Sequence, residues 1–238
     1  MLPWHHGLES FVRERVPLAQ MTNYRVGGPA EFFAEPPGEE ALTLVLRRAA
    51  EHALPVRMLG HGTNLLVADA GVKGLVLRLP KEGFSTLNRT DKRLEVGAGH
   101  SLPSLVKWSA DAGLGGLEGL VGVPGTVGAA LRMNAGGKYG EISDRVMRVA
   151  GCRMDGARFD LRREECGFRY RDSGLKGRIV TRCEMALDEA APDESRDTLR
   201  RILDEKRATQ PLADRSAGCV FKNPRLPGVP PGIPSPWS

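Results

Sequence analysis

The chain has 238 residues, of which 41% are hydrophobic and 26% charged, so it can bury a core and has the composition of an ordinary globular protein. It has neither an apolar stretch long enough to cross a membrane nor a signal-like apolar run near its N-terminus, so we expect a cytoplasmic protein with no membrane partner. The net charge of +5 suits an anionic partner, but only 5% of the residues are aromatic and they are not interleaved with the arginines, which argues against nucleic acid.

The N-terminal part of the chain predicts a turn, a helix and then several strands. Gly27-Gly28-Pro29 predicts a turn within residues 22–30. From Gly38 to Leu54 the apolar residues recur with the period of an amphipathic helix, which Pro55 ends. Apolar runs between turn residues predict short strands at residues 56–59, 65–68, 75–79 and 94–96.

The second half of the chain continues with one helix among strands. The helix is predicted at residues 102–112 and ends before Gly113. Further strands are predicted at residues 145–154, 158–161 and 179–187. Short helices inserted among many strands do not fit a fold of regular βαβ repeats.

The last predicted helix covers residues 196–208, after an acidic linker at residues 188–195. Its apolar face consists of Leu199, Ile202 and Leu203. Its charged residues, which we interpret as a solvated face, include Arg200, Arg201 and Lys206.

Gly60-His61-Gly62-Thr63-Asn64 predicts a tight turn between two strands. Successive N–H groups in such a turn form a nest that binds an anion, and Thr63 and Asn64 add side-chain donors. The turn lacks the Gly-Lys-Ser/Thr of a Walker loop and the glycine spacing of a Rossmann fingerprint. Taken alone, it also fits an ordinary packed turn.

Residues 117–140 form an apolar stretch that is rich in glycine, and no residue between Glu118 and Arg132 is charged. The missing side chains let a flat or phosphorylated ligand approach the main chain. The corner Pro124-Gly125-Thr126 predicts a short helix from Val127, whose free N–H groups would face an anion. A packed turn between strands is the alternative. A third glycine turn is predicted at residues 96–99.

Five motifs occur along the chain in the order of one enzyme family. They are GHGTNLLVAD at 60–69, VGAG at 96–99, GLEGLVGVPGTVGAA with NAGGKYG behind it at 116–140, FRYRDS at 168–173 and SAGCVFKNP at 216–224. Together they resemble the UDP-N-acetylenolpyruvoylglucosamine reductases, the flavoenzymes of peptidoglycan precursor synthesis. The resemblance runs from about Asn23 to Pro224.

The resemblance implies an α+β chain with the FAD-binding fold of the vanillyl-alcohol oxidase type, also called the PCMH type. Two FAD-binding subdomains are implied at residues 1–57 and 58–188, and an incomplete α+β substrate domain at residues 189–238. The implied reaction uses NADPH to reduce non-covalently bound FAD. The reduced flavin then converts UDP-N-acetylglucosamine enolpyruvate to UDP-N-acetylmuramate. A monomer is implied, and the positive net charge suits a substrate that carries a diphosphate and a carboxylate.

The family pattern assigns the cofactor-binding residues to the N-terminal turn and the glycine segments. They are Tyr24, Gly60, His61, Gly62, Thr63, Asn64, Leu65, Gly119, Val123, Pro124, Gly125, Thr126, Gly128, Ala129, Asn134 and Gly136. We expect them to contact FAD through main-chain amides and small side chains.

The family pattern also implies two catalytic residues. Arg171 would hold the substrate carboxylate, since an arginine fork can bind a carboxylate bidentately where negative charge develops. Cys219 stands where the family commonly has a proton-donating serine, and a thiol, with a pKa of about 8.5, can serve instead. The remaining residues implied to bind substrate are Tyr170, Lys222 and Asn223. A surface ion pair of Arg171 with Asp172 is the alternative.

The other cysteines, Cys152, Cys166 and Cys183, have no C-x-x-C spacing. We therefore expect no metal site and no disulfide, and we assign these three to packing.

After Pro224 the sequence RLPGVPPGIPSPWS departs from the family pattern, and no glutamate follows Glu205. We expect an aberrant tail at residues 225–238, flavin binding, and poor turnover. One alternative is a catalytically impaired FAD-binding fragment or regulatory module. Another is an FAD-dependent oxidase with covalently attached flavin, for which His61 or His100 would be suspected.

Overall fold

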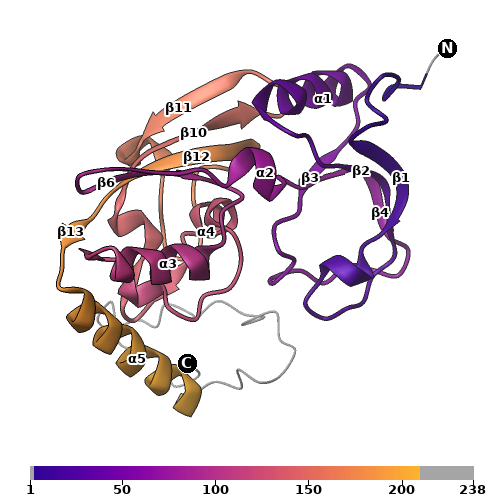
Figure 1. The fold of residues 1–238 in the computed structure, drawn as a ribbon. Helices are drawn as coiled ribbons and strands as arrows, with labels where there is room; N and C mark the ends of the chain where they lie inside the picture. The colour runs from indigo at the N-terminus through magenta and orange to yellow at the C-terminus, as the bar shows by residue number, and fades with distance from the viewer. Residues whose placement is uncertain (1–2, 210–238) are drawn as a thin grey trace, which may run out of the picture.

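Two lobes, each built on one β-sheet, make up residues 3–209, the part of the chain that the computed structural model describes (Figure 1). The N-terminal lobe holds a four-stranded sheet of order β1-β2-β4-β3. The second lobe holds a five-stranded sheet of order β11-β10-β12-β6-β5. None of the helices within residues 3–209 combines the length and the apolar character that a bilayer span needs.

The sheet of the N-terminal lobe is mixed. Strand β1 pairs antiparallel with β2, while β2 and β3 both pair parallel with β4. The strands are β1 (Val12–Pro17), β2 (Pro29–Ala34), β3 (Val56–Met58) and β4 (Val72–Leu77). Because β3 and β4 belong to one sheet, the sheet crosses the expected subdomain boundary after residue 57, and that division stays a prediction.

Helix α1 (Glu39–Glu51) connects β2 to β3 and covers this sheet. Strands β2 and β3 run parallel on either side of β4, so the connection between them needs such a crossover, and the helix forms here because four apolar residues share one face. Those residues, each fully buried, are Leu42, Val45, Leu46 and Ala49. They pack against Leu75 and Leu77 of β4 in one core cluster. The predicted helix from Gly38 is thereby confirmed, with its end a few residues before Leu54.

The sheet of the second lobe is antiparallel throughout. Its strands are β5 (Leu87–Thr90), β6 (Arg93–Gly97), β10 (Val146–Arg153), β11 (Arg158–Arg162) and β12 (Arg178–Ala186). Its helices are α2 (Lys81–Phe84), α3 (Leu102–Asp111), α4 (Val127–Met133) and α5 (Pro192–Thr209). Helices α3 and α4 lie on one side of the sheet, and α5 packs against α3 (Figure 1).

Several short elements connect these parts of the second lobe. The two-residue strands are β7 (Leu114–Gly115), β8 (Gly136–Gly137), β9 (Gly140–Glu141) and β13 (Asp188–Glu189). Within residues 3–209, the 3-10 helices of this lobe are η2 (Glu118–Leu120), η3 (Ile142–Asp144) and η4 (Arg163–Cys166), and η1 (Ala19–Met21) lies in the N-terminal lobe between β1 and β2. Strand β13 pairs with β7, so the chain leading into α5 is held against the end of α3.

Two local predictions are wrong. Residues 65–68 form no strand, because Leu65 and Leu66 are 39% and 76% exposed and the segment joins no ladder. This short apolar run, which we expected to form a buried strand, is therefore an exposed loop. The predicted linker at residues 188–195 instead holds β13 and the first turn of α5. This helix starts at Pro192, since proline is well tolerated in the first helical turn.

Glu39 joins the two lobes. Its carboxylate accepts a hydrogen bond from Thr181 Oγ1 at 2.7 Å and pairs with Arg182 Nη1 at 3.2 Å, both on β12. Arg158 Nη2 lies 3.8 Å from the other carboxylate oxygen. Because Thr181 is only 3% exposed, loss of the carboxylate leaves a buried hydroxyl with a weaker set of partners.

Replacing Glu39 with alanine should lower the free energy of unfolding by about 1–2 kcal/mol, the cost of losing a charge-assisted hydrogen bond. Urea denaturation followed by circular dichroism measures the change. Glu40→Ala is the matched control, because Glu40 lies next in the same helical turn and its carboxylate has no partner within residues 3–209. Equal losses for both variants would show that Glu39 does not hold the lobes together.

Candidate functional site

Three glycine segments from separate parts of the chain meet at the junction of the lobes. A Cβ atom at Gly60 would lie 3.3 Å from Thr126 Oγ1, and one at Gly125 would lie 3.3 Å from Thr63 Oγ1. The Gly128 N–H donates to Ala98 O at 2.8 Å, so the third segment, the turn at residues 96–99, also lies here. Parts of the motifs at 60–69, 96–99 and 116–130 therefore lie side by side in the fold, and their binding of a cofactor stays a prediction.

The loop after β3 supplies a row of main-chain donors. The N–H groups of residues 60–65 have no hydrogen-bond partner in the described part of the chain. Gly62 has a left-handed φ of 66°, and a Cβ there would overlap Met21 O, so only glycine fits. The Asn23 N–H donates to Gly62 O at 3.0 Å, which places Tyr24 and its neighbours beside the loop. Free N–H groups on a partly exposed loop fit a phosphate.

The N-terminus of α4 does not serve as an anion site, contrary to expectation. The Val127 N–H donates to His100 O at 2.9 Å, and the Gly128 N–H donates to Ala98 O. The Ala129 N–H donates at 3.3 Å to the Oγ1 atom of Thr126, which caps the helix. The first N–H groups of α4 thus bind the turn after β6. Within residues 3–209, the N–H groups of Gly125 and Thr126 have no partner.

Gly119 and Gly136, which were also predicted to bind the cofactor, allow the main chain of residues 117–140 to pack against itself. A Cβ at Gly119 would overlap Tyr139 O, and one at Gly136 would overlap Gly140 O. Val123 follows η2, and its N–H donates to Leu120 O at 3.0 Å, just before Pro124. These residues therefore set the path of the main chain.

Arg171 lies in a two-residue turn between the bridged residues Arg169 and Asp172. The two N–H groups of this bridge donate across it at 2.9 and 3.0 Å. Arg171 has a left-handed φ of 53°, which costs a residue with a Cβ atom about 1–2 kcal/mol. Its guanidinium carbon lies 6.0 Å from the centre of the Tyr170 ring, and both side chains are exposed. Arg15 and Arg25 have similar φ values, so it is the exposed guanidinium within the family motif that makes Arg171 a candidate for ligand binding.

Lys206 was expected in a solvated face and is instead half-buried beside the glycine stretch. Its Nζ atom donates to Val121 O at 2.5 Å and to Gly119 O at 3.4 Å. Burial lowers the pKa of Lys206, and the nearby Arg171 guanidinium lowers it further. Lys206 follows Ile202 by four residues and so shares its buried helical face, which is the signal that the sequence analysis overlooked.

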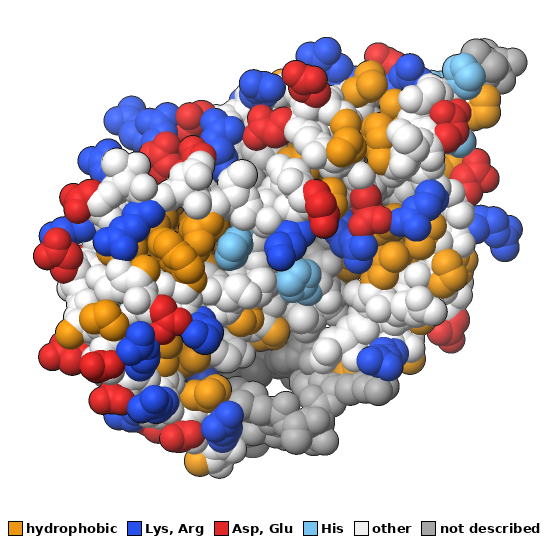
Figure 2. Space-filling model, in the orientation of Figure 1, with side chains coloured by type: hydrophobic (Ala, Val, Ile, Leu, Met, Phe, Trp, Pro, Cys, Tyr) orange, Lys and Arg blue, Asp and Glu red, His pale blue; other side chains and the backbone are white. Residues whose placement is uncertain are grey.

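The two suspected histidines lie beside glycine turns. Partial burial lowers the pKa of His61, and repulsion from Arg78 adds to this, so both effects favour the neutral ring. His100 Nδ1 lies 3.0 Å from Ser85 O. Figure 2 shows histidine side chains between the lobes, with positive and negative side chains mixed around them. A neutral His61 leaves anion binding at the loop to the main-chain donors.

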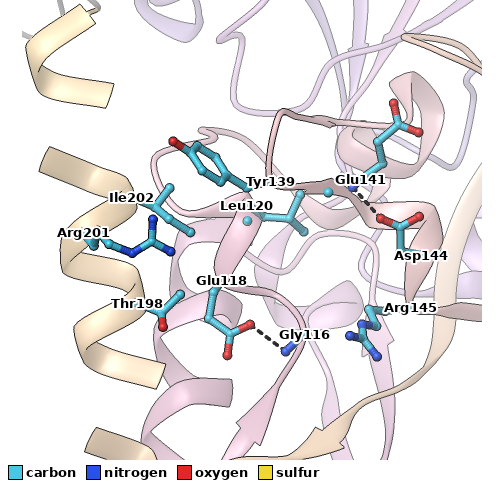
Figure 3. A pocket seen from close by; sticks show the side chains of 12 residues that line it. Gly116, Glu118, Leu120, Tyr139, Glu141, Asp144, Arg145, Thr198, Arg201 and Ile202 are labelled. Atoms are coloured by element: carbon cyan, nitrogen blue, oxygen red, sulfur yellow. Dashed lines mark hydrogen bonds between the residues drawn. The ribbon is translucent and has the colours of Figure 1, made fainter. Parts of the chain in front are cut away.

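A cavity of about 320 Å³ lies where α5 meets the glycine stretch (Figure 3). Arg201 and Ile202 of α5 face Tyr139 and Glu118 across it. Its charged groups are already paired, for example Arg201 with Glu205 at 3.0 Å. Among the predicted cofactor residues of the described chain, only Gly119 lines this cavity, so it is separate from the glycine junction.

The three cysteines assigned to packing are buried, as predicted. Burial raises the pKa of each of their thiols, that of Cys166 to about 11. Cys219, Lys222 and Asn223 lie outside the described residues, as does the tail at residues 225–238.

At pH 8 the native protein should therefore show no more than one thiol that reacts with a small disulfide reagent, since the thiolate is the nucleophile. After unfolding in guanidinium, all four cysteines of the chain should react. The absorbance of the aromatic thiol that the reagent releases gives the number of reactive cysteines in the native and in the unfolded protein. Reaction of two or more thiols in the native protein would contradict the assignment to packing.

The comparisons with known proteins agree on one family. A family model described as an FAD binding domain matches residues 30–161. UDP-N-acetylenolpyruvoylglucosamine reductase 2 of Symbiobacterium thermophilum is 43% identical over 90% of this chain and 70% of its own length. The Thermus thermophilus reductase is 46% identical over 89% of this chain and 75% of its own length.

Solved structures give the same fold. The reductase from Thermus caldophilus superimposes with a TM-score of 0.78 at 43% identity, covering 90% of this chain and 76% of that chain. Berberine bridge enzyme from Eschscholzia californica, at 17% identity, has a TM-score of 0.54 over 67% of this chain and 34% of that chain, which shows the fold alone. The predicted α+β FAD-binding fold of the PCMH type is thus confirmed, and the chain belongs to the UDP-N-acetylenolpyruvoylglucosamine reductase family.

Proposed function

We propose that this chain is an FAD-dependent reductase that uses NADPH to convert UDP-N-acetylglucosamine enolpyruvate to UDP-N-acetylmuramate. The reaction belongs to peptidoglycan precursor synthesis, and we place it in the cytoplasm, in a monomer. The observation that carries the proposal is the strained Arg171 turn, in the motif that the family uses for substrate, beside a junction of glycine segments suited to a dinucleotide.

The residues of the junction fit non-covalently bound FAD. The unpaired N–H groups of residues 60–65 would hold its phosphates, with Thr63 and Asn64 at their side. Gly60, Gly125 and Gly128 let the three segments that would surround the cofactor pack closely, since a Cβ at each would lie 3.3 Å or less from an atom of a neighbouring segment. When bound, the flavin would supply hydride chemistry, taking hydride from NADPH and giving it to the enolpyruvyl carbon. Each of these contacts is a proposal.

The chain's own residues would bind the substrate and supply the proton. The Arg171 guanidinium can hold the carboxylate through two parallel hydrogen bonds, which strengthen as negative charge develops there. Tyr170 would pack beside it. Cys219 would give a proton to the carbon next to the carboxylate, and Lys222 and Asn223 would bind the substrate. These last three roles rest on the sequence motif.

Titration of the purified protein with FAD, followed by anaerobic addition of NADPH and then substrate, tests the proposal. We expect yellow protein, loss of the visible flavin absorption band with NADPH, and its return with the enolpyruvyl substrate but not with UDP-N-acetylglucosamine. Protein that takes up no flavin would refute the proposal. Flavin that binds without any response to substrate would favour the impaired module, and flavin that stays with the denatured polypeptide would favour the oxidase.

A further inference from the structure

Asn134, at the C-terminal end of α4, is predicted from its motif to contact the cofactor, but its side chain is fully engaged within the protein. It is 1% exposed, and its backbone is left-handed, with φ 45° and ψ 59°. Its Nδ2 atom donates to Glu141 Oε2 at 2.6 Å and to the main-chain oxygen of Arg169 at 3.1 Å. Its Oδ1 atom accepts from the Ser143 N–H at 3.3 Å. An amide with these partners has little capacity left for a ligand.

A second tie joins the same end of α4 to the Arg171 turn. Ser173, which is 1% exposed, donates from Oγ to Arg132 O at 2.8 Å. The Arg132 guanidinium lies 3.6 Å from the Asp172 carboxylate. The turn from Arg169 to Asp172 is therefore attached to α4 at both of its ends.

The other end of α4 belongs to the glycine junction. Thr126 caps the N-terminus of α4 and lies against the loop after β3, since a Cβ atom placed on Gly60 would be 3.3 Å from Thr126 Oγ1. The helix has seven residues, so it spans about 10 Å. A short rigid helix thus connects the cofactor loops to the turn that carries Arg171.

We infer that Asn134 is a positioning residue that fixes the Arg171 turn, and with it the guanidinium, relative to the cofactor junction. The inference rests on the proposed function of Arg171. Without the bond to Arg169 O, the turn loses one of its two ties and can relax away from the left-handed conformation that Arg171 adopts. Misplacement by about 1 Å far from the reacting atoms can cost as much as about 100-fold.

A double-mutant cycle between Asn134→Gly and Arg171→Lys tests this inference. Glycine keeps the left-handed backbone and removes only the side chain. The readout is the Kd of UDP-N-acetylglucosamine enolpyruvate for the flavin-loaded protein, from the change in flavin absorption. We expect N134G to raise this Kd about tenfold in the native background but less than about threefold beside R171K, because the two changes act through one contact. The Kd of FAD should change less than about threefold in either variant.

Asn88→Gly, at an exposed position on β5, is the matched control and should leave the substrate Kd unchanged. If N134G does not fold, Ser173→Ala removes the hydrogen bond to Arg132 O, one of the two contacts of the second tie, and should show the same dependence on Arg171. An equal rise in Kd with and without R171K, or no rise at all, overturns the inference while Arg171 keeps its role. If R171K itself leaves the Kd unchanged, the proposed role of Arg171 fails and the inference fails with it.

Discussion

Replacing Arg171 with lysine should slow reduction of the enolpyruvyl substrate about 100-fold, the effect of losing one preorganised donor to developing negative charge. Lysine keeps the positive charge but cannot form two parallel bonds to a carboxylate. The backbone strain at φ 53° is the same for both side chains, so stability should hardly change. The loss should therefore fall on substrate binding and on the rate of substrate reduction, while the free energy of unfolding stays the same.

Anaerobic stopped-flow measurement of the two half-reactions checks this result. Loss of flavin absorbance with NADPH should change by less than about threefold, while its return with substrate slows about 100-fold. Arg148→Lys is the control, because Arg148 forms an exposed ion pair with Asp160 at 2.9 Å on the second sheet. A substrate half-reaction at the native rate in R171K would exclude Arg171 as the carboxylate-binding residue.

Replacing Gly62 with alanine should weaken FAD binding about 100-fold, the effect of losing one or two charge-assisted hydrogen bonds. The added Cβ would overlap Met21 O, and φ 66° suits glycine alone, so the main chain must shift. That shift turns the N–H groups of the loop away from the positions that we propose for the phosphates. The enzyme should fold and emerge from purification largely colourless.

Quenching of flavin fluorescence during titration with apoprotein gives the affinity. Gly38→Ala is the matched control, since a Cβ at Gly38 meets nothing within 4 Å and its backbone is extended. An unchanged affinity in G62A would mean that the loop after β3 does not hold the phosphates.

Local patterns in the sequence were sufficient to predict where the regular helices form. The spacing of Leu42, Leu46 and Ala49 places α1 correctly, because burial of one face decides where an amphipathic helix forms. Strand β1 was not predicted, since its sequence VRERVP includes three charged residues and only Val12 at its start is buried. Its position depends on pairing with β2, whose first two residues fell within the predicted turn at residues 22–30 and whose other residues were assigned to no element.

The glycine motifs identified segments that the fold brings together, but they did not predict the hydrogen bonds that these segments form within the protein. The N–H groups at the start of α4 were expected to be free and are taken by the turn after β6. Asn134 bonds to the main chain of Arg169, 35 residues later, and Lys206 bonds to carbonyls more than 80 residues before it. Such partners follow from tertiary packing, which no local periodicity encodes.

The seven residues of α4 work as a spacer of fixed length between Thr126 and Asn134. Deleting one residue would rotate the far end by about 100° and shorten the spacer by about 1.5 Å. Asn134 would then point away from Arg169, whatever the identity of the deleted residue. Sequence variation in this segment should therefore be limited to substitutions, while insertions and deletions accumulate in the outer loops.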